Sequence, residues 1–239
     1  MTSSRPPIIA LAVAACALLL LFVSGIGYRQ ELWSLQMAFA MIKWAAYLGI
    51  AAALLALIGA AVTRPIGRAT LLFGVAFVIA AGTAYWPWRW KQVASSVPPI
   101  HDVTTDTQDP PPFVAILPLR ANARNSAVYG GDSIAALQRV GYPDLGPVTI
   151  AEPAGAAFTR ALTAARAMGW EVVAVDSSDG RIEATATTRW FGFKDDVVVR
   201  VRDVENGSRV DVRSVSRVGG SDVGTNAARI RAFLAQLQR

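Results

Sequence analysis

The chain has 239 residues, and its 53% hydrophobic content and mean hydropathy of +0.38 are too high for an ordinary soluble domain. Its formal net charge of +6 would suit nucleic acid, but the excess cations all lie in residues 1–100. That part contains seven Lys or Arg and one acid, whereas residues 101–239 contain sixteen charges of each sign. Flanking cations of this kind are typical of membrane segments, so nucleic acid is excluded as the default partner.

Three apolar stretches near the N-terminus are long enough to cross a bilayer, whose core of roughly 30 Å needs about 20 helical residues. We predict a three-helix transmembrane anchor over residues 1–92, with spans at about 8–26, 43–62 and 69–86. Lys43 is expected at an interface, so the residues before it either lie along the surface or extend a tilted helix. The lipid bilayer is therefore the first expected partner.

Charges beside the spans leave the orientation open. Arg64 and Arg68 in a short loop without acids favour a cytoplasmic N-terminus and an external soluble domain. Four cations on the other side favour the reverse, namely Arg29, Lys43, Arg89 and Lys91. Charge alone therefore gives only a slight preference for the first arrangement.

Two proline-rich runs mark a connector over residues 93–118, where proline prevents a regular helix. Residues 119–239 then show alternating hydrophobicity and turn signals, which predict an α+β domain with an antiparallel sheet of about four to five strands. The expected order is β-α-β-β-β-β-α, preceded by one short helix, with the helices on one face of the sheet. We expect the other face to be exposed to solvent or to bind something. The predicted elements are a helix at 131–140, a strand at 147–150, a helix from 152, strands at 170–175, 181–188, near 197–202 and 209–218, and a helix from about 221.

The soluble part offers few catalytic groups. It contains no cysteine and, with its connector, only His101, which excludes cysteine nucleophiles and zinc sites built from several His or Cys ligands. There is no G-x-S-x-G motif for a serine nucleophile. We therefore predict no catalytic residues, no metal and no cofactor.

Three polar groups remain as candidate ligand-binding or partner-binding residues. The first lies in the connector, where an imidazole and carboxylates could hold a divalent cation but are also typical turn formers. The second is a pair of adjacent acids at a strand start, which point to opposite faces and are expected to pair with Arg217 or Arg213. The third is a glycine-rich approach to the last helix, either an anion site or a capped helix with an Asp–Arg pair. The candidates are His101, Asp102, Thr105, Asp106, Asp195, Asp196, Arg217, Ser221, Asp222, Asn226 and Arg229.

The same residues resemble the bacterial and plastid family called domain of unknown function 1499 (DUF1499). The resemblance rests on Ser216-Arg217-Val218-Gly219 with the motif from Ser221 to Ile230, and on the stretches 101–106, 142–145 and 195–197. It covers about residues 98–238. Family members often carry an N-terminal membrane or lipoprotein-like segment, which implies an extracytoplasmic domain on a multi-pass protein of the bacterial inner membrane. The resemblance implies no activity, but it suggests that the three polar groups form one site, with the connector packed back near Arg217 and Arg229.

Three functional hypotheses follow. The leading one is a non-enzymatic, membrane-anchored envelope protein whose domain binds a partner or an anionic or lipid-like ligand. The second is a hydrolase-type enzyme that uses the connector and strand carboxylates with His101. The third is an accessory or assembly subunit of a membrane complex, with other membrane or envelope proteins as partners. A pocket lined by acids and His101 would favour the enzyme, and a sealed network of salt bridges would favour a structural role.

Overall fold

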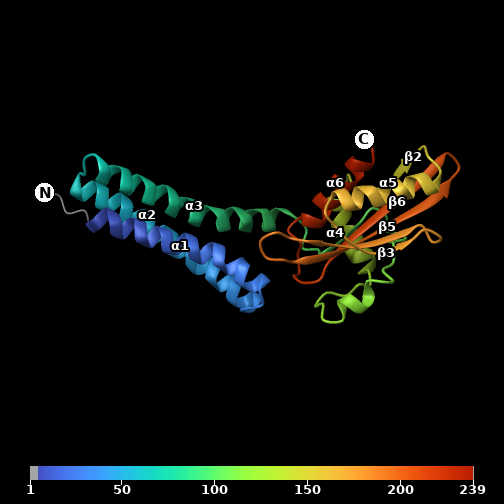
Figure 1. Cartoon of the computed structure of the whole chain (residues 1–239), viewed down its shortest axis with the longest axis horizontal. Helices are drawn as coiled ribbons and strands as arrows, with labels where there is room; N and C mark the ends of the chain where they lie inside the picture. The colour runs from blue at the N-terminus through green and yellow to red at the C-terminus, as the bar shows by residue number, and fades with distance from the viewer. Residues whose placement is uncertain (1–4, 239) are drawn as a thin grey trace. The chain divides into compact units, whose positions relative to one another are not determined.

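A computed structural model describes residues 5–238 of the chain (Figure 1). The chain divides into two compact units. Unit 1 comprises residues 1–93 together with the short segment 189–192, and unit 2 comprises residues 94–188 and 193–239.

Unit 1 is built on three long helices, α1 (Arg5–Arg29), α2 (Leu35–Thr63) and α3 (Arg68–Ser96). By length and composition, all three could cross a membrane, which confirms the prediction of three apolar N-terminal helices. They are longer than predicted because the residues before Lys43 extend α2, and α3 continues through Pro87.

Small side chains bring the helices of unit 1 close together. The buried residues of α2 include Ala45, Gly49, Ala52 and Ala56. A Cβ atom on Gly49 would lie 2.8 Å from the Ala80 carbonyl oxygen of α3, so the two backbones approach too closely there for a larger residue. This is the type of packing that small residues permit between apolar helices.

Unit 2 contains an antiparallel sheet of six strands. Five follow the order β1-β6-β5-β4-β3, and β2 also pairs with β6. Their bounds are β1 (Asp102–Thr104), β2 (Val148–Ile150), β3 (Glu171–Asp176), β4 (Arg181–Thr187), β5 (Lys194–Val204) and β6 (Gly207–Ser216). The prediction of an α+β domain is confirmed. The extra strand is β1, which lies inside the predicted connector and joins the sheet because Val103 is anchored in the core.

Two helices cover one face of the sheet. Figure 1 shows α5 (Ala154–Ala167) and α6 (Thr225–Leu237) together on this side. Their apolar side chains pack on alternating valines of β5 and β6, and Trp170 stacks on Phe233 with ring centroids 5.1 Å apart. This apolar layer is the main core of the unit, and we call this side the helix face.

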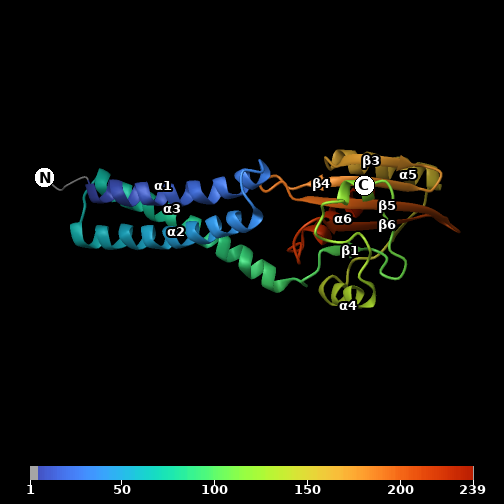
Figure 2. The same cartoon turned by 90° about the horizontal axis from the view of Figure 1, so that it is seen from below.

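The helix α4 (Gly131–Gly141) protects the free edge of β1 (Figure 2). The buried Gln138 side chain accepts a hydrogen bond from the Thr104 N–H at 3.0 Å and donates one to the Thr104 carbonyl at 2.6 Å. An amide side chain thus takes the place of a neighbouring strand and closes the sheet edge.

The second face of the sheet is also buried, which corrects the expectation of an exposed or ligand-binding face. Most residues of β5 and nearly all of β6 are buried on both sides. Residues 105–129, which we call the cover segment, supply Phe113 and Ile116 against Val198 and Val215 on this face. The segment includes the short 3-10 helix η1 (Leu117–Arg120). The alternation of apolar and polar residues along β5 and β6 did not reveal this cover, because the polar residues of these strands form buried ion pairs.

Candidate functional site

The candidate residues fall on both faces of the β5–β6 hairpin. Asp195 lies opposite Ser216, and Asp196 lies opposite Val215 in the strand register. Because successive side chains in a strand point to opposite faces, Asp195 faces the helices and Asp196 faces the cover segment. This confirms the prediction that the adjacent acids cannot act as one carboxylate pair.

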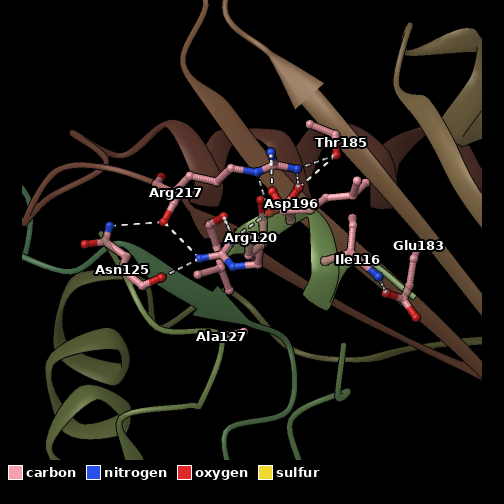
Figure 3. A network of polar contacts seen from close by, with 12 residues as sticks. Ile116, Arg120, Asn125, Ala127, Glu183, Thr185, Asp196 and Arg217 are labelled. Atoms are coloured by element: carbon pink, nitrogen blue, oxygen red, sulfur yellow. Dashed lines mark hydrogen bonds and ion pairs between the residues drawn. The ribbon is translucent and has the colours of Figure 1, made fainter. Parts of the chain in front are cut away.

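We call the face of the sheet that the cover segment covers the cover face. Asp196 is the centre of a buried cluster on this face (Figure 3). Its carboxylate is 0% exposed and accepts hydrogen bonds from two guanidinium groups, Arg120 at 2.5 Å and Arg217 at 2.8 and 2.9 Å. The Thr185 hydroxyl donates a further bond at 2.8 Å. The predicted pairing of Asp196 with Arg217 is therefore confirmed, and Arg120 is a second partner that the sequence analysis missed.

The two arginines of this cluster also hold the cover segment. Arg217 donates to the Leu119 carbonyl at 3.0 Å, and Arg120 donates to the Asn125 carbonyl at 2.9 Å. The Asn125 side chain in turn donates to the carbonyls of Ser216 and Gly219. The cluster therefore ties the turn after η1 to the end of β6.

A second buried acid, Glu183 of β4, holds the residues that lead into η1. Its carboxylate accepts hydrogen bonds of 2.9–3.1 Å from the backbone N–H groups of Val114, Ala115 and Ile116. Arg181 lies 3.1 Å away and balances its charge. Glu183 was not among the predicted candidates, although a glutamate inside a β-branched and alanine-rich strand was a signal that could have marked it.

Asp102 forms a two-pronged ion pair with Arg213, with distances of 2.9 and 2.7 Å. The Arg213 guanidinium lies 5.2 Å from the Phe113 ring centroid and 5.4 Å from the Tyr129 ring centroid, within the range of cation–π contacts. It also donates to the Ala127 carbonyl at 2.8 Å. Burial, with the Asp102 charge, raises the pKa of Tyr129 to about 12.

Asp106 belongs to a separate cluster further along β6. It pairs with Arg209 at 2.6 Å and with Arg200 at 3.5 Å. Both arginines also contact Asp211, which is 0% exposed. Thr105 fixes this position, because its hydroxyl and its N–H bond the backbone of Val212.

Another polar group surrounds Asn226 on the helix face. The Asn226 amide donates to the His101 carbonyl and to the Ser216 hydroxyl, both at 3.0 Å. Its side-chain oxygen accepts bonds from Ser214 at 2.8 Å and from Arg229. Arg229 also pairs with Asp195 at 2.6 Å. All hydrogen-bonding positions of the Asn226 amide are thus used inside the protein.

The Asp222 carboxylate holds the start of the last helix. Its carboxylate accepts bonds from the N–H groups of Gly224 and Asn226, and α6 begins at Thr225, slightly later than predicted, after Gly224 in a left-handed conformation. The Ser221 hydroxyl accepts a bond from the Val223 N–H. Burial raises the pKa of Asp222 above its usual range.

The connector packs back on the domain, but the three polar groups do not form one site. The His101 carbonyl accepts a bond from the Ser216 N–H, and the Asp222 N–H donates to the Ile100 carbonyl, so this part of the connector lies near Asn226 as expected. Asp106, however, lies beside Arg209 rather than beside Arg217 or Arg229. Arg217 follows Arg209 by eight positions, almost all of them in β6, which corresponds to roughly 27 Å of extended chain.

A cavity of about 480 Å³ in unit 2 lies elsewhere, between α5 and the end of α6. It is lined by Glu152, Arg160 and neighbouring residues and by none of the eleven candidates. Within residues 5–238, no group of three or more His, Cys, Asp or Glu side chains has a geometry that could hold a metal ion. The ion pairs and hydrogen bonds described above join the polar groups into an internal lattice.

The chain thus combines three apolar helices with an α+β domain held by buried ion pairs. Residues 102–237, more than half of the chain, match the model of the family described as protein of unknown function (DUF1499). The chain belongs to this family. A comparison with curated proteins finds no match.

Proposed function

We propose that the chain is a multi-pass protein of the bacterial inner membrane whose α+β domain is a non-enzymatic binding or scaffold module on the extracytoplasmic side. The three apolar helices support the membrane assignment. Arg64 and Arg68, between the second and third helix, support the orientation through the preference of cations for the cytoplasmic side.

One observation carries the scaffold assignment. The acids that a hydrolase would need are already neutralised by arginines inside the domain, as with Asp196 between Arg120 and Arg217. A catalytic carboxylate needs access to a substrate and a pKa matched to its task. Asp196 and Asp211 are both 0% exposed, so they are placed to stabilise the fold.

The cover segment offers a surface for a partner. Val114, Leu117 and Leu119 are 50%, 47% and 54% exposed, although the backbone between them is fixed by Glu183 and the Asp196 cluster. Rigid, exposed apolar side chains are typical of protein-binding surfaces because little conformational entropy is lost on binding. We propose that this apolar tip, residues 114–119, binds another membrane or envelope protein.

Cysteine labelling of the full chain in intact spheroplasts tests the topology. In a Cys16→Ser background, Ser177→Cys places a thiol on the exposed β3–β4 turn, and Ile66→Cys places one between α2 and α3. A membrane-impermeant maleimide should label residue 177 and label residue 66 only after lysis. The reverse pattern would place the domain in the cytoplasm, and release of the chain by alkaline washing would overturn the membrane assignment.

Site-specific photo-crosslinking in native membranes tests the binding surface. A photoreactive residue at Leu119 should give a defined adduct, whereas one at Val204, which is 39% exposed at the end of β5, should give none. Adding Leu117→Asp should reduce the Leu119 adduct roughly tenfold, as expected when an interface anchor is replaced by a charge. Equal adducts at both positions, or no effect of Leu117→Asp, would contradict the proposed surface.

A further inference from the structure

Unit 1 contains an apolar groove between α1 and α3. Its volume is about 490 Å³, within the range of small-molecule pockets, which runs from roughly 300 to 1,000 Å³. The lining includes Phe22, Val78, Gly82, Trp86 and Trp190. Residue 190 belongs to the segment that is part of unit 1.

Two of the polar groups that line this groove, the Thr83 hydroxyl and the Trp190 ring N–H, already have partners inside unit 1. The Thr83 hydroxyl donates to the Ile79 carbonyl at 2.8 Å, and the Trp190 ring N–H donates to the Phe22 carbonyl at 3.0 Å. A polar ligand would therefore find few groups to bind along the groove, whereas an aliphatic chain would leave the Thr83 and Trp190 bonds in place. The occupant should be apolar along the groove.

Two tryptophans mark one end of the groove. The rings of Trp86 and Trp190 meet edge to face with centroids 4.9 Å apart. Tryptophans of membrane proteins concentrate at the level of the lipid headgroups. This end of the groove therefore corresponds to the position of a headgroup, and the remainder to the acyl region.

Exposed cations accompany these tryptophans. Arg89 follows Trp86 by three residues on α3, so it lies on the same side of the helix. Arg189 directly precedes Trp190, and Arg29 donates to the Arg189 carbonyl at 2.5 Å. The only acid in the sequence of unit 1 is Glu31. This end of unit 1 is thus complementary to an anion.

We propose that the groove binds one anionic glycerophospholipid, with an acyl chain along α1 and α3 and the phosphate beside Arg89 and Arg189. The shared chemistry, an aliphatic chain with a phosphate, would also fit an isoprenyl phosphate, but the groove is open to the side, with Phe22 and Val78 55% and 69% exposed. A bilayer lipid can therefore enter laterally. The inference rests on the proposed membrane anchoring.

Two substitutions separate groove filling from general effects on α3. A Cβ on Gly82 or on Gly74 would meet nothing within 4 Å, so a side chain starts in open space at both positions. Gly82 lines the groove and Gly74 does not. Gly82→Leu therefore fills the groove, and Gly74→Leu is its matched control on the same helix.

Native mass spectrometry of the full chain in detergent, titrated with phosphatidylglycerol or phosphatidylcholine, tests the proposal. We expect one tightly bound phosphatidylglycerol, reduced roughly tenfold in affinity by Arg89→Gln with Arg189→Gln but unchanged by Arg64→Gln with Arg68→Gln. Gly82→Leu should abolish the tight binding, and Gly74→Leu should retain it.

Equal affinity for both lipids, or tight binding that survives Gly82→Leu, would overturn the proposal. Displacement of phosphatidylglycerol by a lower concentration of an isoprenyl phosphate would overturn the choice of lipid. Membrane fractionation distinguishes a failure of the proposed lipid site from a failure of the proposed membrane anchoring. A chain that stays in membranes but binds no selected lipid refutes only the groove site, whereas a chain that washes off refutes the anchoring.

Discussion

Asp195 and Asp196 are neighbours in the chain, yet their carboxylates lie on opposite faces of the sheet and pair with different arginines. Asp195 pairs with Arg229 of α6, and Asp196 pairs with Arg217 of the segment after β6 and with Arg120 of the cover segment. Two consecutive residues of one strand therefore fasten the two layers that enclose the sheet. Substitution of Asp195 therefore tests the attachment of the helix layer, and substitution of Asp196 tests the attachment of the cover segment.

Removal of the Asp196 carboxylate should strongly destabilise unit 2. Asp196→Ala would leave the Arg120 guanidinium, whose side chain is 4% exposed, without a counter-charge, and we expect a loss of about 3–5 kcal/mol in the free energy of unfolding. Urea denaturation of the full chain in detergent measures this. Asp179→Ala, which removes an exposed partner of Arg181, should cost less than about 1 kcal/mol. Similar losses for both variants would refute the structural role assigned to Asp196.

Glu183 should control the opening of the cover segment. Glu183→Gln keeps the size of the side chain but places an amide N–H₂ against backbone N–H donors, so we expect a loss of about 2 kcal/mol in local stability. Trypsin cleavage after the buried Arg120 should accelerate roughly 30-fold, as follows from that change in free energy. Glu171→Gln, at an exposed position of β3, should leave the cleavage rate unchanged. Slow cleavage in both variants would show that the cover is held by other contacts.

Arg213 should not tolerate lysine. A lysine ammonium cannot form the two-pronged contact with Asp102 while stacking on Phe113 and Tyr129, so Arg213→Lys should lower the free energy of unfolding by about 2 kcal/mol. Arg202→Lys, whose side chain is 52% exposed, is the matched control and should have little effect. Thermal unfolding of the detergent-solubilised chain compares the two. Equal melting temperatures would contradict the importance of the planar guanidinium.

Tyr142 should make unit 2 sensitive to alkaline pH. Burial, with the Asp222 charge, raises the pKa of Tyr142 to about 12, and its buried hydroxyl has no hydrogen-bond partner among residues 5–238. The unfolded chain loses this proton at about pH 10 while the folded chain keeps it, so stability falls as the pH rises from about 10 to 12. The contribution lost stays below about 2–3 kcal/mol, because nearby solvent screens the phenolate charge.

The variant Tyr142→Phe removes both the titration and the unpaired hydroxyl. It should therefore be as stable as the natural chain, or up to about 1 kcal/mol more stable, at neutral pH. Its advantage should then grow between about pH 10 and 12. Tyrosinate absorbance during titration should lose one component near the pKa of about 12. An unchanged titration curve would show that Tyr142 ionises like an exposed tyrosine.

Much of the architecture could be predicted because it follows from local periodicity. The apolar runs predicted three helices, and the alternation of Val197, Val199 and Val201 placed β5 with one face in the core. The same alternation correctly separated Asp195 from Asp196. These features depend only on neighbours in the chain, which the sequence displays directly.

The cover segment could not be predicted in the same way. Arg209, Asp211 and Arg213 on one side of β6 have the composition of a solvent-exposed face, and a buried ion lattice uses the same residue types. Their partners Asp102 and Asp106 lie about a hundred residues earlier in the chain. Only the three-dimensional contacts reveal that these charges neutralise one another. In the sequence, the separate ion pairs therefore resembled a single binding site.

The ion pairs on the cover face also depend on the register of the strands. A shift of β6 by one residue would carry Arg213 to the helix face and bring Val212 to Asp102, so an incorrect alignment would bury charges among valines. A strand with two apolar faces would penalise such a slip less severely, since one aliphatic residue would replace another. The charged face therefore specifies the register, because its ion pairs can form in only one alignment of the strands. The fold is specified by its polar side as much as it is stabilised by its apolar side.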